Sequence, residues 1–309
     1  MQPIPGITIR TAEPADIRAA FAVFRRSLQP MLHRLGSVLS PELTDLELEE
    51  QWPARAAWVE HVWRTAAENW VAVSDADGSV VGWAISIQRG PLLELTDFFV
   101  LPGAQARGVG RVLLERAMPT GGGPRRAIVA TQDPRAMSRY LRSGARFITS
   151  IIDLSAPPRR VTPDTDLSFE RLEVSAASVA LIGQVEEVLV GHRRDVDIEF
   201  LLGIRPAWIA RRRGTPVGFA FGAGTDDLTG PIGTLDRGDM PALLDLVETA
   251  AGESGAAMTY FSVPLANHTA VEHLLGRGYR IDPFFASFLA DTEWLKVDRW
   301  VHTGSSNIF

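Results

Sequence analysis

One stretch, residues 93–118, constrains the fold of this chain more than any other. It opens with an apolar and aromatic run over residues 93–101, which is typical of a largely buried strand. Pro102 and Gly103 end that strand, because proline lacks a backbone donor and glycine allows a turn. Apolar residues at helical spacing then predict a helix that stops near Pro119. The chain is therefore expected to pass from a buried strand through a glycine-bearing turn into a helix.

The turn between the strand and the helix reads Gln105-x-x-Gly108-x-Gly110. A helix that begins here has N–H groups without intrahelical partners, and its dipole favours negative charge at this end. Because glycines let a ligand approach the backbone closely, the turn is suited to binding phosphate groups. Two common phosphate motifs are excluded, since no Gly-Lys-Ser/Thr ends the turn and Leu113 stands where a dinucleotide-binding turn has its third glycine.

The composition sets wider limits on what the chain does. Its 309 residues, 46% hydrophobic and 22% charged, are typical of a globular protein with two domains. A net charge of -6 gives no general basic surface for nucleic acid. The absence of cysteine excludes disulfides, thiolate metal sites and a cysteine nucleophile, and the histidines have no metal-ligand spacing. Neither a signal-peptide pattern nor a long apolar run is present, so we expect a cytoplasmic protein without a membrane span.

The rest of the first half predicts strands alternating with helices. A helix is expected after Asp16, and Asp77-Gly78 between two apolar runs is a strong hairpin signal. Predicted strands occupy residues 7–10, 70–74, 80–88, 126–130 and 146–154. The less regular residues 29–60 contain His33, Trp52 and Trp58, which either pack a helical hairpin or, as the family resemblance carried by the next motif implies, overhang the acceptor site.

A second motif, Asp133-x-x-Ala136-x-x-x-Tyr140-x-x-x-Gly144, begins a helix after the predicted strand at 126–130. With the Gln-x-x-Gly-x-Gly turn, it resembles the GNAT N-acetyltransferase superfamily, whose signatures are Gln/Arg-x-x-Gly-x-Gly/Ala and Asn-x-x-Ala-x-x-x-Tyr-x-x-x-Gly-Phe. The sequence departs from this pattern in two places. Asp133 replaces the asparagine, and Phe147 follows Gly144 by three residues instead of one.

This resemblance implies an α/β (α+β) protein of two tandem GNAT-fold domains, each with a mixed, mostly antiparallel central sheet flanked by helices. It implies acetyl-coenzyme A as co-substrate and no metal. The residues that it assigns to cofactor binding lie on the strand end, the turn and the second motif: Phe98, Phe99, Val100, Gln105, Ala106, Arg107, Gly108, Val109, Gly110, Arg111, Asp133 and Ala136.

The resemblance also implies two catalytic residues, Tyr140 and Glu94. In the resembled fold a bulge splays the strand from its neighbour, so that a backbone N–H near Phe99 or Val100 polarises the thioester carbonyl. Tyr140 corresponds to the proton donor for the departing thiolate, with a packing role as the alternative. Glu94 corresponds to the glutamate that deprotonates the amine in some members; a carboxylate in an apolar strand is expected to have a raised pKa. A solvent-facing or arginine-paired carboxylate remains the alternative, and strand alternation predicts Asp97 on the opposite face.

The second half repeats the first in weakened form. Four of its residues keep the spacing of the second motif without a gap: Asn267, Ala270, Leu274 and Gly278. The boundary is expected in the proline-rich stretch after residue 156, which gives domains of 1–158 and 159–309. Where the first half has its glycine turn, the second has Asp236 and Asp239, which would repel a pyrophosphate. Because the tyrosine is also replaced, by Leu274, the second domain is predicted to be non-catalytic.

These features predict an N-acetyltransferase that acts on a primary amine of a small molecule or peptide by direct attack in a ternary complex. Neither nucleic acid nor a membrane is expected as a partner, and the protein is expected as a monomer or homodimer. An acyl-coenzyme A sensor or pseudoenzyme without turnover is the alternative, and transfer of a longer acyl group or to a group other than an amine also stays open.

The C-terminal residues 294–309 are too apolar for a free tail, since they include Trp294, Trp300, Ile308 and Phe309. We therefore expect this segment to pack back across the domain boundary.

Overall fold

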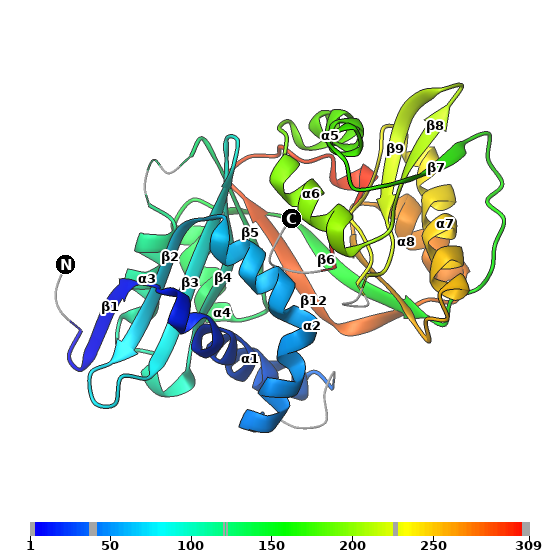
Figure 1. Ribbon diagram of the computed structural model, residues 1–309. Coiled ribbons are helices and arrows are strands. Elements are labelled where there is room, and N and C mark those ends of the chain that lie inside the picture. Colours follow the sequence, from blue (N-terminus) through cyan, green and yellow to red (C-terminus); the bar gives the residue numbers. More distant parts are fainter. Residues whose placement is uncertain (1–3, 37–41, 120, 122, 225–227, 305–309) are drawn as a thin grey trace. The chain divides into compact units, whose positions relative to one another are not determined.

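A computed structural model describes residues 4–36, 42–119, 121, 123–224 and 228–304 of the chain. The chain divides into two compact units (Figure 1). Unit 1 comprises Met1–Arg146 with Leu289–Asp291, and unit 2 comprises Phe147–Phe288 with Thr292–Phe309.

The sheet of unit 1 is mixed and mostly antiparallel, as the sequence predicted. Its strands run in the order β1, β2, β3, β4, β5, and the end of β12 follows β5. The bounds are β1 Ile7–Thr11, β2 Ala66–Ser74, β3 Val80–Arg89, β4 Leu92–Val100 and β5 Arg125–Ala130. Neighbours from β1 to β4 are antiparallel, whereas β4 and β5 are parallel.

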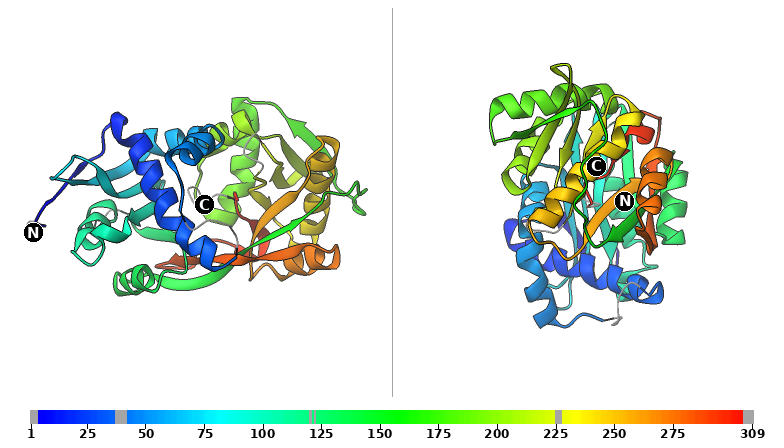
Figure 2. Two further views of the ribbon diagram at one scale, coloured as in Figure 1. Left: turned by 90° about the horizontal axis from the view of Figure 1, so that it is seen from below. Right: turned by 90° about the vertical axis from the view of Figure 1, so that its right-hand side faces the viewer.

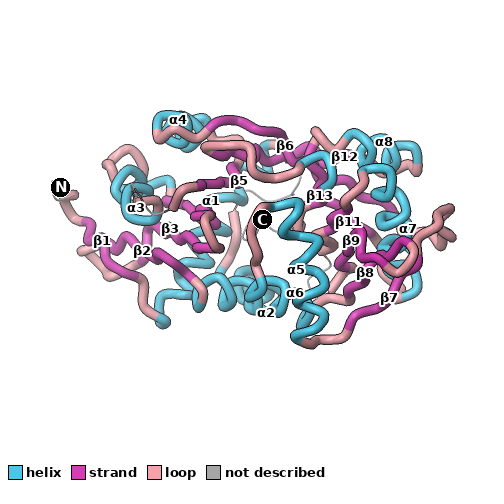
Figure 3. The backbone as a smooth tube through the Cα atoms, turned by 90° about the horizontal axis from the view of Figure 1, so that it is seen from above, coloured by secondary structure: helices cyan, strands magenta, loops and turns pink. Residues whose placement is uncertain are grey.

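Helices cover both faces of this sheet (Figure 3). The bounds are α1 Ile17–Arg34, α2 Asp45–Arg64, α3 Val109–Ala117 and α4 Pro134–Arg142. On one face α3 packs closely, since a Cβ added at Gly82 would lie 2.9 Å from Leu113. On the other face Phe24 of α1 packs on Phe99 of β4, with ring centroids 4.9 Å apart. Alternation along β3 and β4 therefore assigns one set of side chains to the α3 face and the other to the α1 face.

Local interactions explain where these helices begin. Arg10 of β1 makes a two-pronged ion pair with Asp16, at 2.6 and 2.9 Å, which fixes the entry into α1. Thr44 caps α2 and exchanges hydrogen bonds with Glu47 in a capping box. Trp58 is buried and Trp52 packs edge-on against Phe21, so these two tryptophans pack the helical hairpin.

Unit 2 contains two groups of paired strands. One has the order β12, β6, β11, with bounds β12 Arg280–Ala290, β6 Arg146–Ala156 and β11 Thr259–Pro264. The other has the order β13, β10, β9, β8, β7, with bounds β13 Trp300–Val301, β10 Ile232–Thr234, β9 Thr215–Phe221, β8 Ala207–Arg212 and β7 Ser168–Leu172. Its helices are α5 Ala176–Val190, α6 Asp195–Ile204, α7 Met240–Glu253 and α8 His268–Gly276, and α7 and α8 pack side by side (Figure 2).

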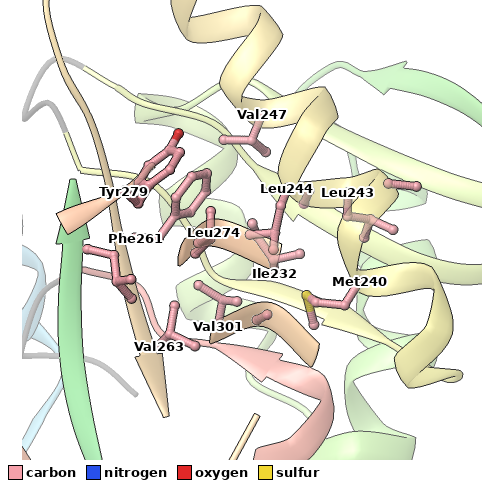
Figure 4. Packing of buried hydrophobic residues seen from close by; sticks show 14 of the residues in the cluster. Ile232, Met240, Leu243, Leu244, Val247, Phe261, Val263, Leu274, Tyr279 and Val301 are labelled. Carbon is pink, nitrogen blue, oxygen red and sulfur yellow. The ribbon is translucent and has the colours of Figure 1, made fainter. Parts of the chain in front are cut away.

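The core of unit 2 is a contiguous cluster of buried apolar side chains (Figure 4). It joins Phe261 and Val263 of β11 to Leu243 and Val247 of α7 and to Leu274 of α8. A separate cluster forms the core of unit 1 between its sheet and α3 and α4, with Leu113 and Tyr140 among its members. Each unit therefore has a hydrophobic core of its own.

The repeat in the sequence is present in the structure with the same spacing. Strand β5, helix α4 and strand β6 have counterparts in β11, α8 and β12, and each counterpart begins at the same separation along the chain from the element it matches. Gly144 and Gly278, the matching glycines after α4 and α8, both have positive φ, at 94° and 83°. Both halves thus use the same strand, helix and strand in their last third.

Two strands are assigned differently from the predicted division at residue 158. Strand β6 pairs with β11 over residues 151–156, so it belongs to unit 2 although it precedes the proline-rich linker. The end of β12 belongs to unit 1, where Asp291 N donates to Arg126 O at 3.3 Å and Asp291 Oδ1 accepts from Arg126 N at 3.0 Å. Linker composition marks a break in secondary structure, but strand membership is decided by pairing partners far away in the sequence.

The described part of the C-terminal tail packs as part of unit 2. Trp300 and Val301 form β13, which pairs with β10, and both side chains are fully buried. The tail is thus buried, as expected. It was expected to pack across the domain boundary, however, and β10, the strand that pairs with it, belongs to unit 2 like the tail itself. Ile308 and Phe309, which contributed to that expectation, lie outside the described residues.

Asp153 is expected to make the stability of unit 2 depend on pH. Burial is the main cause that raises its pKa to about 6; a hydrogen bond from Ser262 Oγ lowers it in part, and the charge of Asp282 raises it further. Between the ordinary pKa and about 6, the unfolded chain has released this proton while the folded chain still holds it, so this group makes the folded state less stable as pH rises through that window.

We expect Asp153→Asn to raise the free energy of unfolding at pH 7 by roughly 1–3 kcal/mol, because the neutral amide avoids the cost of burying a charge. Its advantage over the parent should grow from about pH 4 to about pH 6 and stay constant above, as measured by denaturant unfolding at each pH. Ser262→Ala controls for loss of the hydrogen bond alone. An advantage that is independent of pH would contradict this account of Asp153.

Candidate active site

The site forms where β4 and β5 part. Their parallel pairing covers Leu92–Leu95 of β4 and Arg125–Ile128 of β5, and β4 then continues to Val100 without further register to β5. A bulge lies at the same level on the other side of β4, where Thr96 is the extra residue between the pairs Leu95–Ser86 and Asp97–Ile85. The end of β4 therefore has an edge, residues 96–100, that faces away from β3 and is not paired with β5.

The alternation of backbone groups shows which residues present that edge. Leu101 N donates to Val81 O at 2.9 Å, so this pair exchanges hydrogen bonds across β3 and β4. Back as far as the bulge at Thr96, every second residue of β4 does the same. The backbone of Phe99 is therefore directed toward β3, and that of Phe98 and Val100 toward the open edge. Of the two N–H groups that the sequence suggested for polarising a carbonyl, those of Phe99 and Val100, the geometry selects Val100.

The predicted phosphate-binding turn follows directly after this strand. Ala106 and Gly108 adopt positive φ, at 65° and 91°, and α3 begins at Val109 with Gly108 as its N-cap. Gln105 Nε2 donates to Val100 O at 2.8 Å, which joins the turn to the strand end. Arg107 anchors the turn through a 2.5 Å hydrogen bond from its guanidinium to Pro5 O.

The turn also has the features that a bound anion requires. Within the described part of the chain, the N–H groups of residues 106–110 donate to no protein acceptor. Gly110 packs so tightly that a Cβ there would lie 3.3 Å from the ring of Phe98. Arg111 lies on the exposed side of α3, where it pairs with Glu115 at 3.3 Å. Free donors at the start of a helix next to a tightly packed glycine are suited to binding a phosphate group.

Helix α4 borders the same region of unit 1. Asp133 caps it, since its Oδ1 accepts from Arg135 N at 2.8 Å, so the departure from asparagine keeps the capping acceptor but removes an amide donor. Ala136 packs against the core of unit 1. Tyr140 lies one turn further on, buried in that core, and its ring meets Phe98 at a centroid distance of 6.1 Å.

Burial, with a smaller contribution from the negative charge of Asp133, raises the pKa of the Tyr140 hydroxyl. The phenol therefore stays protonated near neutral pH and has a proton available for a hydrogen bond. Its contact with Phe98, whose backbone faces the open edge of β4, connects α4 to that edge.

The bulge at Thr96 overturns one expectation about the two carboxylates of β4. Cross-strand partners share a face, and Glu94 is opposite Ile87 while Asp97 is opposite Ile85. Ile85 and Ile87 lie two apart on β3 and hence on one face, so Glu94 and Asp97 also lie on one face. Strand alternation predicted opposite faces because the extra residue, which resets the alternation, leaves no mark in the sequence.

Both carboxylates are almost fully buried, Glu94 at 1% and Asp97 at 2% exposed. They share their face with Phe99, which packs against Phe24 of α1, and therefore lie on the side covered by α1. Asp97 is the site candidate that sequence reasoning placed wrongly. In the sequence, Asp97 is marked only as a polar residue within an otherwise apolar strand. The bulge, which the sequence does not reveal, turns its side chain to the face of Glu94.

The corresponding region of unit 2 has the same strand geometry and different chemistry. Leu235 N donates to Val217 O at 2.8 Å, the counterpart of the bond from Leu101 to Val81, and this aligns the strand ends of the two units. From these leucines α3 begins after eight residues but α7 after five, so the loop in unit 2 is shorter by three residues. Leu274, at the position of Tyr140, is a buried core residue.

The two carboxylates of that shorter loop are already engaged. Asp236 Oδ1 accepts from Gly238 N at 2.9 Å, and Asp239 is paired with Arg212 at 2.6 Å. Pro241, in the first turn of α7, has no N–H to offer. The start of α7 thus lacks the set of free donors found at the start of α3.

The described residues contain no group of three or more histidine and acidic side chains that could hold a metal ion. No helix among them has both the length and the apolar character needed to span a membrane.

Part of the chain matches a known protein family. Residues 35–144 match the model of the acetyltransferase (GNAT) family. No curated protein matches the chain. Among solved structures, a candidate acetyltransferase from Pyrococcus horikoshii has a TM-score of 0.74 at 14% identity, covering 100% of this chain and 98% of its own.

Two further solved structures are similar over most of their length. A GCN5-related N-acetyltransferase from Sphaerobacter thermophilus has a TM-score of 0.60 at 18% identity, covering 93% of this chain and 95% of its own. A tandem GNAT protein from the clavulanic acid biosynthesis pathway has a TM-score of 0.56 at 16% identity, covering 92% and 98%. Residues 35–144 therefore match the GNAT family, and the whole chain has the fold of tandem GNAT proteins.

Proposed function

We propose that unit 1 transfers an acetyl group from acetyl-coenzyme A to a primary amine of a small molecule or peptide, by direct attack in a ternary complex. The observation that carries this proposal is the open edge of β4, with the Val100 backbone directed into it and the free N–H groups of residues 106–110 directly after it. The GNAT family match over the same residues supports acyl transfer as the class of reaction.

In this proposal each end of the co-substrate has its own partners. The N–H groups of the turn from Ala106 to Gly110 would hold the pyrophosphate, while the edge of β4 and the start of α4 would flank the pantetheine arm. When bound, acetyl-coenzyme A supplies a thioester whose carbonyl carbon is open to attack by a neutral amine. The Val100 N–H, directed to that edge, would donate a hydrogen bond to the carbonyl oxygen.

The two buried carboxylates supply the base. An amine with an ordinary pKa is charged at neutral pH, so it must lose a proton before it attacks. Glu94 would accept that proton, and Asp97, on the same buried face, would help to orient the ammonium group as it arrives. As the carbon–nitrogen bond forms and the carbon–sulfur bond breaks, the Tyr140 hydroxyl would donate to the departing sulfur.

Acetyl-coenzyme A is a cytoplasmic metabolite, so we place the reaction in the cytoplasm, with the protein acting as a monomer or homodimer and without nucleic acid or membrane. Unit 2 is proposed to be non-catalytic, because its shorter loop carries engaged carboxylates and Leu274 replaces the tyrosine. A sensor that binds acyl-coenzyme A without turnover is the second candidate, favoured by the same turn.

An acceptor panel separates these two candidates. The parent protein would be incubated with acetyl-coenzyme A and aminoglycosides, polyamines, amino acids or peptides, and release of free coenzyme A recorded. Turnover with any amine, lost in the Glu94→Gln variant, supports the transferase. Tight binding of acetyl-coenzyme A with no turnover across the panel would favour the sensor.

Charge at the turn should control cofactor binding. Gly108→Asn and Gly108→Asp introduce side chains of equal size, and both residues tolerate the positive φ of this position, so they differ only in charge. We expect Gly108→Asp to bind acetyl-coenzyme A at least tenfold more weakly than Gly108→Asn in calorimetric titration, with the difference shrinking at high salt. Equal affinities would show that the pyrophosphate is bound elsewhere.

The Tyr140 hydroxyl should matter for turnover and not for binding. Tyr140→Phe keeps the ring that packs on Phe98, so the Kd for acetyl-coenzyme A should barely change while kcat falls by roughly 10²-fold. Tyr279→Phe makes the same chemical change at a buried tyrosine of unit 2 and serves as the matched control. If Tyr140→Phe turned over at the parent rate, the phenol would be a packing residue.

The two carboxylates should separate by pH profile. Glu94→Gln is expected to lower kcat/KM by roughly 10²-fold near pH 7, with a deficit that shrinks as pH rises, because the acceptor amine then loses its proton to solvent. Asp97→Asn should raise KM more than it lowers kcat, with a deficit that persists at high pH. The reverse pattern would identify Asp97 as the base.

A further inference from the structure

The open strand edge of unit 1 has a counterpart in unit 2, and there it is filled by the chain itself. Register places Ile232 and Thr234 of β10 at the positions of Phe98 and Val100, because Thr234 is opposite Gly218 on β9 as Val100 is opposite Gly82 on β3. The hydrogen bonds from Leu235 to Val217 and from Phe221 to Pro231 then direct the backbone of Ile232 away from β9. In unit 2 this edge pairs with β13, where Val301 is the partner of Ile232.

The opposite edge of the same segment is bound as well. His302 N donates to Ser262 O of β11 at 2.8 Å. Asn267, which matches Asp133 of unit 1 in the repeat, donates from Nδ2 to Trp300 O at 3.0 Å. Strand β11 is the counterpart of β5, so residues 300–302 lie between the counterparts of β4 and β5, bonded on both sides.

Buried side chains and arginine hydrogen bonds hold the segment 299–303 in place. Trp300 is fully buried against Phe219, with ring centroids 5.9 Å apart, and Val301 points into the same cluster as Ile232 and Val263 (Figure 4). Arg299 NH1 donates to Leu235 O and Arg205 NH1 to Thr303 O, each at 2.8 Å. The segment has the backbone contacts of an added strand and the buried anchors of a ligand.

The space between β10 and β11 is called here the slot of unit 2. We propose that this slot is a binding site for an extended peptide, and that the C-terminal segment 300–303 is its built-in ligand. Backbone hydrogen bonds to Ile232 and Ser262, the amide of Asn267 and the pocket for Trp300 define the class of ligand as a peptide strand. With this strand in place, the slot is closed to a pantetheine arm. This inference concerns unit 2 alone and stands independently of the proposed acetyl transfer.

The amide at position 267 has a specific part in this site. Asn267 Oδ1 caps α8 by accepting from Ala270 N at 3.1 Å, while its Nδ2 binds the peptide carbonyl. Asp133 keeps the capping oxygen and has no such donor. Asn267→Asp therefore removes the contact with the peptide and retains the cap, which makes it a matched variant for the slot.

The test cuts the tail only after the protein has folded. A protease site inserted between the exposed residues Thr292 and Glu293 yields a chain whose C-terminal fragment is held by non-covalent contacts alone. These are the contacts of the slot and the packing of Trp294 on His192 and Phe288. Affinity is then measured as displacement of that fragment by a fluorescent synthetic peptide of residues 293–304. We expect the fragment to stay bound through gel filtration and the parent peptide to exchange with it.

Two matched changes test the backbone contacts. A peptide N-methylated at the backbone nitrogen of His302 loses the donor to Ser262 and gains a methyl group there. The cut chain carrying Asn267→Asp loses the donor to Trp300 O and places a carboxylate oxygen next to that carbonyl. Each should weaken peptide binding by about tenfold. Equal affinities for the parent and N-methylated peptides would overturn the proposal, as would a fragment that separates from the cut chain without lowering the Tm of unit 2.

Discussion

The parting of two parallel strands is the constraint on which the rest of this structure depends. Strand β4 loses β5 as a partner after Leu95, so the backbone groups at its far end must find another. A buried strand edge without hydrogen bonds is costly, which makes each such edge a site that a ligand or another strand will fill. Unit 1 keeps the edge next to a turn of free N–H groups, whereas unit 2 covers the equivalent edge with β13.

A few changes around a shared geometry account for the different properties of the two units. In each unit a leucine of the following helix packs against a glycine of the neighbouring strand, Leu113 against Gly82 and Leu243 against Gly218. In each unit the residue after the strand end also donates a backbone hydrogen bond to that neighbouring strand. Unit 2 has a loop shorter by three residues, with carboxylates that are engaged internally. Its tail then occupies the edge, so one fold supports an open slot and a closed one.

Most elements could be predicted from the sequence because their signals are local. The hairpin at Asp77-Gly78, the cap at Asp133 and the helix ends at glycine depend on neighbouring residues, and the repeat followed from equal spacing. Non-local pairing left no such signal: β6 belongs to unit 2 because it pairs with β11, and the bulge at Thr96 turned Asp97 to the face of Glu94. For the candidate site, the turn and its glycines were predictable, but the facing of the two carboxylates was not.

Hydrogen–deuterium exchange with and without acetyl-coenzyme A tests the central claim, that the open slot of unit 1 takes the co-substrate while that of unit 2 is closed by its own tail. We predict slower exchange over residues 98–111 on addition of the ligand, because it would engage the free N–H groups of the turn. Residues 232–241, already protected by β13 and the internal carboxylates, should show no change. Protection that appears over residues 232–241, or is absent over residues 98–111, would contradict the account.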